Sequence, residues 1–278
     1  MLMAKPLFSI IIPTLNEELF LPKLLDSLVA QTFKNFEVFV VDGGSDDKTS
    51  HVASKYTDRL PSLTVITNAK RNVSYQRNTG AHAASGEWVI FIDADSILLP
   101  YALERSHKYI LAHDPTIFTS WFGPDTDKVG EVIVTLGINM IYESGIMLKK
   151  PFTMGTFAGV KRQIFLLVGG YDETISYGED FDMTKRVCQQ GGRYSLIRET
   201  LYIYSLRRFR YQKTLTSIQV GFVTIMSVLF LNRTPKSIAG YIMGGHPYAS
   251  KKKRIKRSAV AQYQRKIRQT LKELFRNQ

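Results

Sequence analysis

The chain has 278 residues, 44% of them hydrophobic and 22% charged, which excludes wholesale disorder and suits one large α/β domain with a small appendage. The formal net charge is +13, but about +10 of it lies in residues 251–278, where eleven Lys and Arg accompany one acid, Glu273. Because Cys188 is the only cysteine, an intrachain disulfide and a cysteine-based metal site are both excluded.

Apolar runs of strand length recur along the first part of the chain, and turn residues and helix-like patterns lie between them. The N-terminal run ends at Pro13 without a small-residue cleavage site, so we interpret it as a first strand and not as a signal peptide. Residues that are apolar at successive positions are typical of strands covered on both faces, and alternation of strands with helices indicates a mostly parallel sheet. The predicted strands are 8–12, 38–41, 63–66, 88–92 and 117–121, and the predicted helices are 21–28, 74–85, 100–113, 129–142 and 179–190.

Polar clusters follow three of the predicted strands. Asn16 and Glu17 come after the first strand, Asp42 with the segment GGSDD after the second, and Asp93 with Asp95 after the fourth. Ligands of open α/β sheets bind beyond the carboxyl ends of the strands, where loops and helix N-termini present hydrogen-bond donors. The sequence therefore predicts a binding site at this edge of the sheet.

Asp93 and Asp95 stand one residue apart at the exit of a predicted buried strand. If the backbone bends there, both carboxylates can face one point and supply hard oxygen ligands for Mg²⁺ or Mn²⁺. A lone D-x-D more often caps a turn. The other polar strand ends favour the functional interpretation here.

The sequence resembles glycosyltransferase family 2, the inverting, nucleotide-sugar-dependent enzymes with the GT-A fold. The matching segments occur in the family's order and are FSIIIPTLNEE (8–18), VVDGGSDDKT (40–49), RNVSYQRNTGAHAASGEWVIFIDADS (71–96), VGGYDE (168–173) and GEDFD (178–182). The resemblance implies an α/β, Rossmann-like GT-A catalytic domain over residues 1–210, with a mostly parallel sheet flanked by helices. Residues 211–278 lie outside the resemblance, and we expect a basic, helical C-terminal extension there.

The resemblance also implies which residues bind the donor, a UDP- or GDP-sugar. Asp42 would receive hydrogen bonds from the base or ribose, and the cations Arg71 and Arg77 suit a diphosphate. Two simpler interpretations stay open, in which Asn16 and Glu17 begin a helix and Arg71 is a solvated surface residue. The full set implied for the donor is Pro13, Thr14, Asn16, Glu17, Asp42, Arg71, Arg77, Asn78, Asp93 and Arg208.

For catalysis, the resemblance places the base that accepts the acceptor's proton on Asp180, with Glu179 positioning the acceptor or the base. It makes Asp95 the direct ligand of Mn²⁺ or Mg²⁺, with Asp93 contacting ribose or reaching the metal through water. The alternative is that the acids of GEDFD are simply those favoured at a helix N-terminus. Arg207, with its neighbour Arg208, is expected either to reach a phosphate or to face solvent. The Q-x-x-R-W pattern of processive synthases is absent, which favours transfer of one sugar at a time.

Residues 214–232 contain no charged side chain and are expected to form a helix that packs on the domain or lies in the membrane interface. The segment KKKRIKR (251–257) suits anionic lipid headgroups, although a solvated tail explains it equally well. Nucleic-acid binding is disfavoured because the rest of the chain lacks a basic excess and a reader motif. We therefore expect a cytoplasmic protein for which peripheral attachment to the inner face of the cell membrane is an option.

Together these features predict a metal-dependent hexosyl- or N-acetylhexosaminyltransferase acting on a glycan or polyprenyl-linked acceptor of the cell envelope. Two alternatives remain. A nucleotidyltransferase on a similar sheet would also use acidic metal ligands, but it usually has a glycine- and arginine-rich loop where this chain has PTLNEE. A non-catalytic basic module would bind membranes or nucleic acid without hydrolysing a donor.

Overall fold

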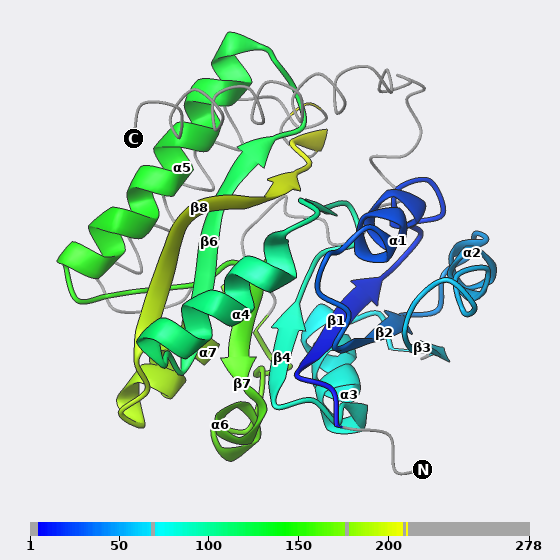
Figure 1. Cartoon of the computed structure of the whole chain (residues 1–278), viewed down its shortest axis with the longest axis horizontal. Helices are drawn as coiled ribbons and strands as arrows, with labels where there is room; N and C mark the ends of the chain where they lie inside the picture. The colour runs from blue at the N-terminus through cyan, green and yellow to red at the C-terminus, as the bar shows by residue number, and fades with distance from the viewer. Residues whose placement is uncertain (1–4, 68–69, 176–177, 208–209, 211–278) are drawn as a thin grey trace.

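The computed structural model describes residues 5–67, 70–175, 178–207 and 210, which fold around one eight-stranded sheet (Figure 1). The strand order is β3-β2-β1-β4-β7-β6-β8-β5. The expected extension over 211–278, with its uncharged and basic segments, lies outside the described residues, as does Arg208.

The N-terminal half of the sheet is parallel. β1 pairs with β2 and β4 in parallel, and β2 pairs with β3. The first four of the five predicted strands are thus confirmed, each within a few residues of its expected bounds. The elements of this half are β1 (Phe8–Thr14), α1 (Leu21–Val29), β2 (Phe36–Asp42), α2 (Thr49–Ser54), β3 (Leu63–Thr67), α3 (Val73–Ala83) and β4 (Trp88–Phe91).

The C-terminal half of the sheet is mixed. β7 runs antiparallel to both β4 and β6, β6 is parallel to β8, and β5 is antiparallel to β8. The predicted strand at 117–121 and the predicted helices beginning at 100, 129 and 179 are present. The elements are β5 (Ile97–Leu98), α4 (Ala102–His113), β6 (Ile117–Pro124), α5 (Val129–Met147), β7 (Ala158–Lys161), α6 (Arg162–Leu167), α7 (Glu179–Gln189) and β8 (Tyr194–Tyr204).

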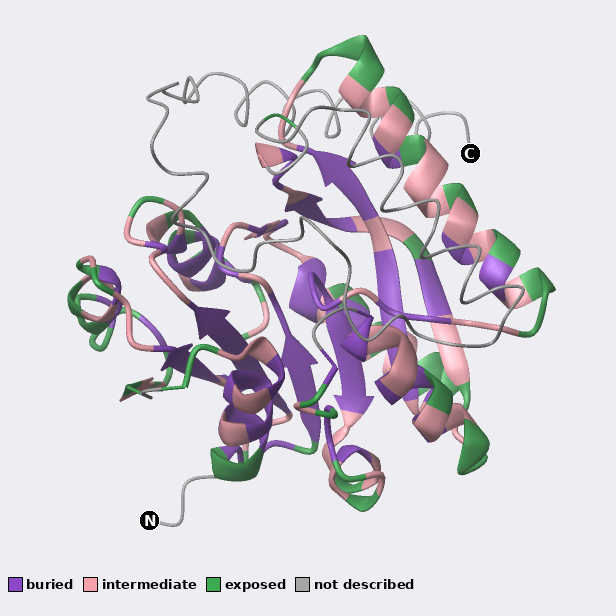
Figure 2. Cartoon of the chain, turned by 180° about the vertical axis from the view of Figure 1, so that it is seen from behind, coloured by how far each residue is buried: buried purple, intermediate pink, exposed green. Residues whose placement is uncertain are grey.

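Both faces of the sheet are covered, as continuous apolar strands require (Figure 2). Ile10 and Ile12 of β1 point to the face that packs against α1, whereas Ile11 points to the opposite face, which packs against α3. Successive strand residues alternate between faces, so a strand buried on both sides must be apolar at every position.

The strand register brings the predicted site loops to one edge of the sheet. Thr14 at the end of β1 is paired with Asp42 at the end of β2. On the other side, Ile11 pairs with Phe91, and Asp93 follows two residues later. The carboxyl ends of β1, β2 and β4 therefore open onto the same place.

Candidate active site

The exits of β1 and β2 are joined by a glutamine that the sequence analysis did not single out. Gln76 of α3 is buried, and its Nε2 donates to the carbonyl oxygens of Thr14 and Val41, both at 2.7 Å. Gly43 lies close to this side chain, since a Cβ there would meet Gln76 Nε2 at 3.1 Å. In the sequence, the one signal for a role of Gln76 is its position next to Arg77 and Asn78 in the segment YQRN.

The loops after β1 and β2 also bind each other directly. Asn16 adopts φ 57°, and its amide oxygen accepts from the backbone N–H of Asp46 at 2.7 Å. Asp42 is buried and accepts from the hydroxyls of Ser45 and Ser50, each at 2.5 Å. α1 begins at Leu21 after Phe20, so Asn16 is not its N-cap. These polar groups shape a closed double loop at the edge where a nucleoside is expected.

Arg77 lies at the centre of the site. Its guanidinium is 3% exposed and forms ion pairs with Glu179 (3.0 Å), Asp180 (3.1 Å) and Asp93 (3.1 Å). It also lies over the ring of Tyr171, with Cζ 5.1 Å from the centroid. Although burial disfavours the cation, the surrounding carboxylates, Asp180 foremost, raise the pKa of Arg77 well above its usual value. The contact brings the D-x-D segment and GEDFD together, as the predicted site requires.

The backbone near Gly155 closes over this guanidinium. A Cβ at Gly155 would lie 1.9 Å from Arg77 Nη2, a distance that no real side-chain atom tolerates. Only glycine lets the chain approach the arginine so closely. Gly155 was not predicted, because nothing in its local sequence indicates a partner 78 residues away.

Asp180 is the second residue of α7, and it combines burial with a charged partner. Burial raises the pKa of Asp180 from 3.8 to about 7, Arg77 opposes this shift, and the neighbouring Glu179 adds to it. A carboxyl group whose pKa lies near neutrality can hold or release a proton at working pH. Asp182 is turned to a separate partner, Arg186, at 2.7 Å.

Asn78 connects α3 to the VGGYDE segment. Its amide oxygen accepts from the N–H of Tyr171 at 2.8 Å, and its Nδ2 donates to the Tyr171 carbonyl at 2.9 Å. Gly170 has φ +67°, and a Cβ at this position would lie only 2.5 Å from Asn78 Oδ1. In the structure Asn78 therefore fixes the loop that covers Arg77, and both ends of its amide are used for that purpose.

A second cation faces Asp95. Arg207 donates to both carboxylate oxygens of Glu17, at 2.5 and 2.9 Å, and its Nε lies 2.7 Å from Asp95 Oδ2. All three side chains are largely buried. Burial raises the pKa of Glu17 to about 7, against the attraction of Arg207. Of the two expectations for Arg207, solvent exposure is wrong, and the arginine instead holds two predicted site acids.

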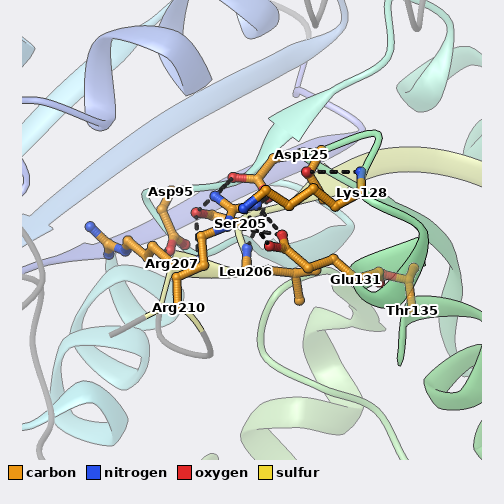
Figure 3. A network of polar contacts seen from close by, with 10 residues as sticks. Asp95, Asp125, Lys128, Glu131, Thr135, Ser205, Leu206, Arg207 and Arg210 are labelled. Atoms are coloured by element: carbon orange, nitrogen blue, oxygen red, sulfur yellow. Dashed lines mark hydrogen bonds and ion pairs between the residues drawn. The ribbon is translucent and has the colours of Figure 1, made fainter. Parts of the chain in front are cut away.

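The segment that carries Arg207 is anchored by a neighbouring network, shown in Figure 3. Asp125, just after β6, accepts from Arg210 at 2.5 and 3.0 Å and from the N–H of Leu206 at 3.2 Å. Arg210 also contacts Glu131 in the first turn of α5, at 2.6 Å. Asp125 thus fixes the chain on both sides of Arg207.

Arg71, a predicted donor residue, lies at the rim. Its Nη2 contacts Asp46 at 2.8 Å and the Gly44 carbonyl at 3.0 Å, and its side chain is about half exposed. Pro13 and Thr14 are the last two residues of β1, and both are buried. Within the described chain, the structure thus assembles the strand-end loops, Arg77, Asp93, Asp95, Glu179 and Asp180 at one edge of the sheet, with Arg71 peripheral.

The residues present fit a divalent cation that shares its shell with a substrate. No group of three or more His, Cys, Asp or Glu side chains arranged to hold a metal occurs in the described part of the chain. Asp93 and Asp95 offer two carboxylates, and Mg²⁺ bound through one or two carboxylates completes its shell with phosphate oxygens and water. Both carboxylates are paired with arginines in the structure.

Comparison with known proteins shows the family of the chain. Residues 9–167 match the family described as "Glycosyl transferase family 2". The chain is 40% identical over 116 residues to a PGL/p-HBAD biosynthesis glycosyltransferase of Mycobacterium bovis, covering 41% of this chain and 45% of that protein. It is 27% identical over 188 residues to an uncharacterized glycosyltransferase of Haemophilus influenzae, covering 66% and 63%. The matched regions span less than two thirds of these relatives.

Two solved structures share the fold. One is S. aureus TarS 1-349 in complex with UDP-GlcNAc, with TM-score 0.61, 20% identity, and coverage of 86% of this chain and 69% of that one. The other is the mannosyltransferase PcManGT from Pyrobaculum calidifontis in complex with GDP-Man and Mn²⁺, with TM-score 0.62, 20% identity, and coverage of 80% and 65%. The sheet and its helices are those of the GT-A fold, as the sequence predicted. The chain belongs to glycosyl transferase family 2.

Proposed function

We propose that the protein is an inverting glycosyltransferase that moves one sugar from a nucleotide-diphosphate donor to an acceptor hydroxyl. The observation that carries the proposal is the convergence of Asp93, Glu179 and Asp180 on the buried Arg77. These acids come from the end of β4 and the start of α7, which are far apart in the chain. A site that binds a donor on one side and an acceptor on the other needs acids from both segments at one place.

Asp180 is the proposed base. Inversion is a single displacement, in which the acceptor oxygen bonds to the anomeric carbon while the bond from that carbon to the diphosphate oxygen breaks. The bonding electrons leave with the nucleoside diphosphate, and Asp180 accepts the acceptor's proton. Glu179 shares Arg77 with Asp180 and positions that carboxylate, and the charge of Arg77 favours the ionised form of Asp180 that a base requires.

The donor lies, in this proposal, over the ends of β1, β2 and β4. Asp42 and the loop of Asn16 form the nucleoside end, and Asp93 and Asp95 lie at the diphosphate end. The fold neighbours that bind UDP-GlcNAc or GDP-Man support a UDP- or GDP-sugar donor. A hexose or an N-acetylhexosamine is the proposed sugar, and a lipid-linked or cell-envelope glycan the proposed acceptor.

We assign Asp95, with Asp93, to a bound Mn²⁺ or Mg²⁺. When bound, the cation would neutralise charge that develops on the leaving diphosphate. The chain's own part is to hold the carboxylates at the exit of β4 and to place Arg207 beside Asp95. The neighbour with GDP-Man and Mn²⁺ supports this assignment.

The test is Asp180→Asn, assayed with a panel of nucleotide sugars and paired with Asp182→Asn as the matched control on the same helix. Asp180→Asn should reduce transfer by at least about a hundredfold, the usual share of a positioned base, while donor affinity changes little. Asp182→Asn should retain transfer, because Asp182 contacts Arg186 instead of Arg77. Unchanged turnover in Asp180→Asn would refute the base assignment.

A further inference from the structure

α5 lies on the outside of the molecule, where much of it is coloured as exposed or intermediate (Figure 2), and it carries a row of exposed apolar side chains. At about 100° per residue these side chains fall within an arc of about 60°, and the row is about 27 Å long. They are between 57% and 82% exposed. We call this row the α5 stripe; it consists of Val129, Ile133, Leu136, Met140 and Met147.

The opposite face of α5 belongs to the core. Thr135, Tyr142 and Gly145 are buried, and the helix packs against β6. By length and composition alone α5 is long and apolar enough to cross a membrane, but only 17% of its most apolar window is buried inside the protein. Since one face is packed on the sheet, the helix can lie in a membrane surface but cannot be surrounded by lipid.

The charges on and beside α5 are arranged for an anionic, apolar partner. Its two acids are both paired with cations: Glu143 accepts twice from Arg198 at 2.9 Å, and Glu131 contacts Lys128 at 3.7 Å and Arg210, which it shares with Asp125. The flanking residues Lys128 and Lys149 are exposed at the two ends of the helix. Lysines at the ends of an apolar helical surface are placed to reach lipid headgroups.

We propose that the α5 stripe docks this protein onto the surface of a lipid bilayer, with Lys128 and Lys149 at headgroup level. The stripe has none of the aromatic residues or arginines that are enriched in protein interfaces, and methionine is the one interface-enriched residue type that it contains. An exposed apolar helix face with lysines at both ends can bury its side chains below the headgroups while the lysines reach anionic phosphates. The strongly basic residues 251–278 add attraction for the same anionic surface.

The buried face of α5, opposite the stripe, is linked to the proposed base by aromatic contacts. Tyr142 of α5 contacts Phe152 at 5.0 Å between ring centroids, and Phe152 stacks on Phe181 at 4.6 Å. Phe181 follows Asp180 in the chain. Docking through α5 thus holds the proposed base at a fixed position relative to the bilayer. The role of that base rests on the proposed function, whereas the docking itself does not.

The test is flotation of the full chain with phosphatidylcholine vesicles, with and without phosphatidylglycerol, at low and high salt. The variant is Ile133→Ser with Met140→Ser, and the matched control is Leu111→Ser with Leu167→Ser, two residues exposed by 73% and 70% on α4 and α6. At high salt, where attraction between charges is screened, the stripe variant should bind at least about tenfold more weakly than the wild type. The control should float like the wild type.

Three outcomes would overturn the proposal. One is equal flotation of the stripe variant and the wild type. Another is a wild-type dimer that the variant converts to a monomer without changing flotation, which would make the stripe an interface between copies. The third is a melting temperature lowered by several degrees in the stripe variant alone, which would mean that the stripe is covered by the chain itself. None of these measurements depends on transferase activity.

Discussion

Arg77 of α3 donates to Asp180 of α7 across 3.1 Å, although 103 residues separate them in the chain. This contact fixes the proposed base at the same point as Asp93, which follows β4. Because Asp93, Glu179 and Asp180 all pair with this one buried cation, the arrangement of the site and the stability of the fold are coupled through Arg77.

Replacing Arg77 should therefore destabilise the fold as well as stop the reaction. Arg77→Met leaves carboxylates without their buried partner, and such a loss typically costs about 3–5 kcal/mol. Arg71→Met is the control, because its half-exposed pair with Asp46 should contribute less than about 1 kcal/mol. Urea unfolding of both variants measures the difference. Equal stability of the two would contradict the central role of Arg77.

The rate of transfer should depend on pH through Asp180. Its pKa is raised to about 7, and a base must be unprotonated, so kcat/KM should rise about tenfold per pH unit below 7 and level off above it. In Arg77→Met the cation that opposes this shift is gone, and the rising limb should move to higher pH. An unperturbed carboxylate stays ionised from about pH 5 to about pH 8. A wild-type profile that is flat over this range would therefore argue against Asp180 as the base.

Stability should follow the same group with a defined sign. The pKa of Asp180 is about 7 in the folded state against an ordinary value of 3.8. Between these two pH values the folded state holds a proton on Asp180 that the unfolded state has released. The contribution of Asp180 to the free energy of unfolding is thus fully present below about pH 4 and is lost as the pH rises through about 7. Asp180→Asn should lessen this decline, which denaturant titrations across the window can measure.

Much of this organisation can be predicted from the sequence, because strand and helix patterns and strand-end acids are local signals. The runs of β1, β2 and β4 set the sheet edge, and Asp93 and Asp180 were expected near one pocket. The contact of Arg207 with Glu17 joins residues 190 positions apart, so no spacing rule predicts it. From the sequence, Gln76 looks like an ordinary helix residue. Its role becomes visible only in the structure, where it donates to the carbonyl oxygens of Thr14 and Val41 at the ends of β1 and β2.

Gly155 provides a test of how closely the backbone must approach Arg77. In Gly155→Ala the new Cβ would require the guanidinium to move, so we expect a loss of about 1–3 kcal/mol in stability and a lower kcat. Gly137→Ala on α5 is the matched control, since nothing lies within 4 Å of its Cβ position. Alanine in a helix is favoured over glycine by about 1 kcal/mol, so the control should be neutral or more stable. Thermal melts and steady-state kinetics on both variants decide the point.

The pair of Glu17 and Arg207 should behave as a coupled unit. Arg207→Met leaves Glu17 and Asp95 without the cation, and a loss of about 3 kcal/mol is expected. Glu17→Gln with Arg207→Met removes a buried charge as well and should recover part of that loss. Additive effects in this double-mutant cycle, measured by urea unfolding, would show that the two side chains do not interact.

Transfer should require a divalent cation held at Asp95. A chelator should abolish activity, and Mn²⁺ or Mg²⁺ should restore it. The protein offers the ion only two carboxylates, and the phosphate oxygens of the donor complete its shell, so a chelator can compete for the ion. Asp95→Asn weakens one ligand and should raise the concentration of Mn²⁺ needed for half-maximal activity by at least about tenfold. Asp182→Asn, which contacts Arg186 away from the D-x-D segment, should leave that concentration unchanged. Full activity in chelator would sink the assignment of Asp95, and Arg207 would then be the cation that faces the diphosphate.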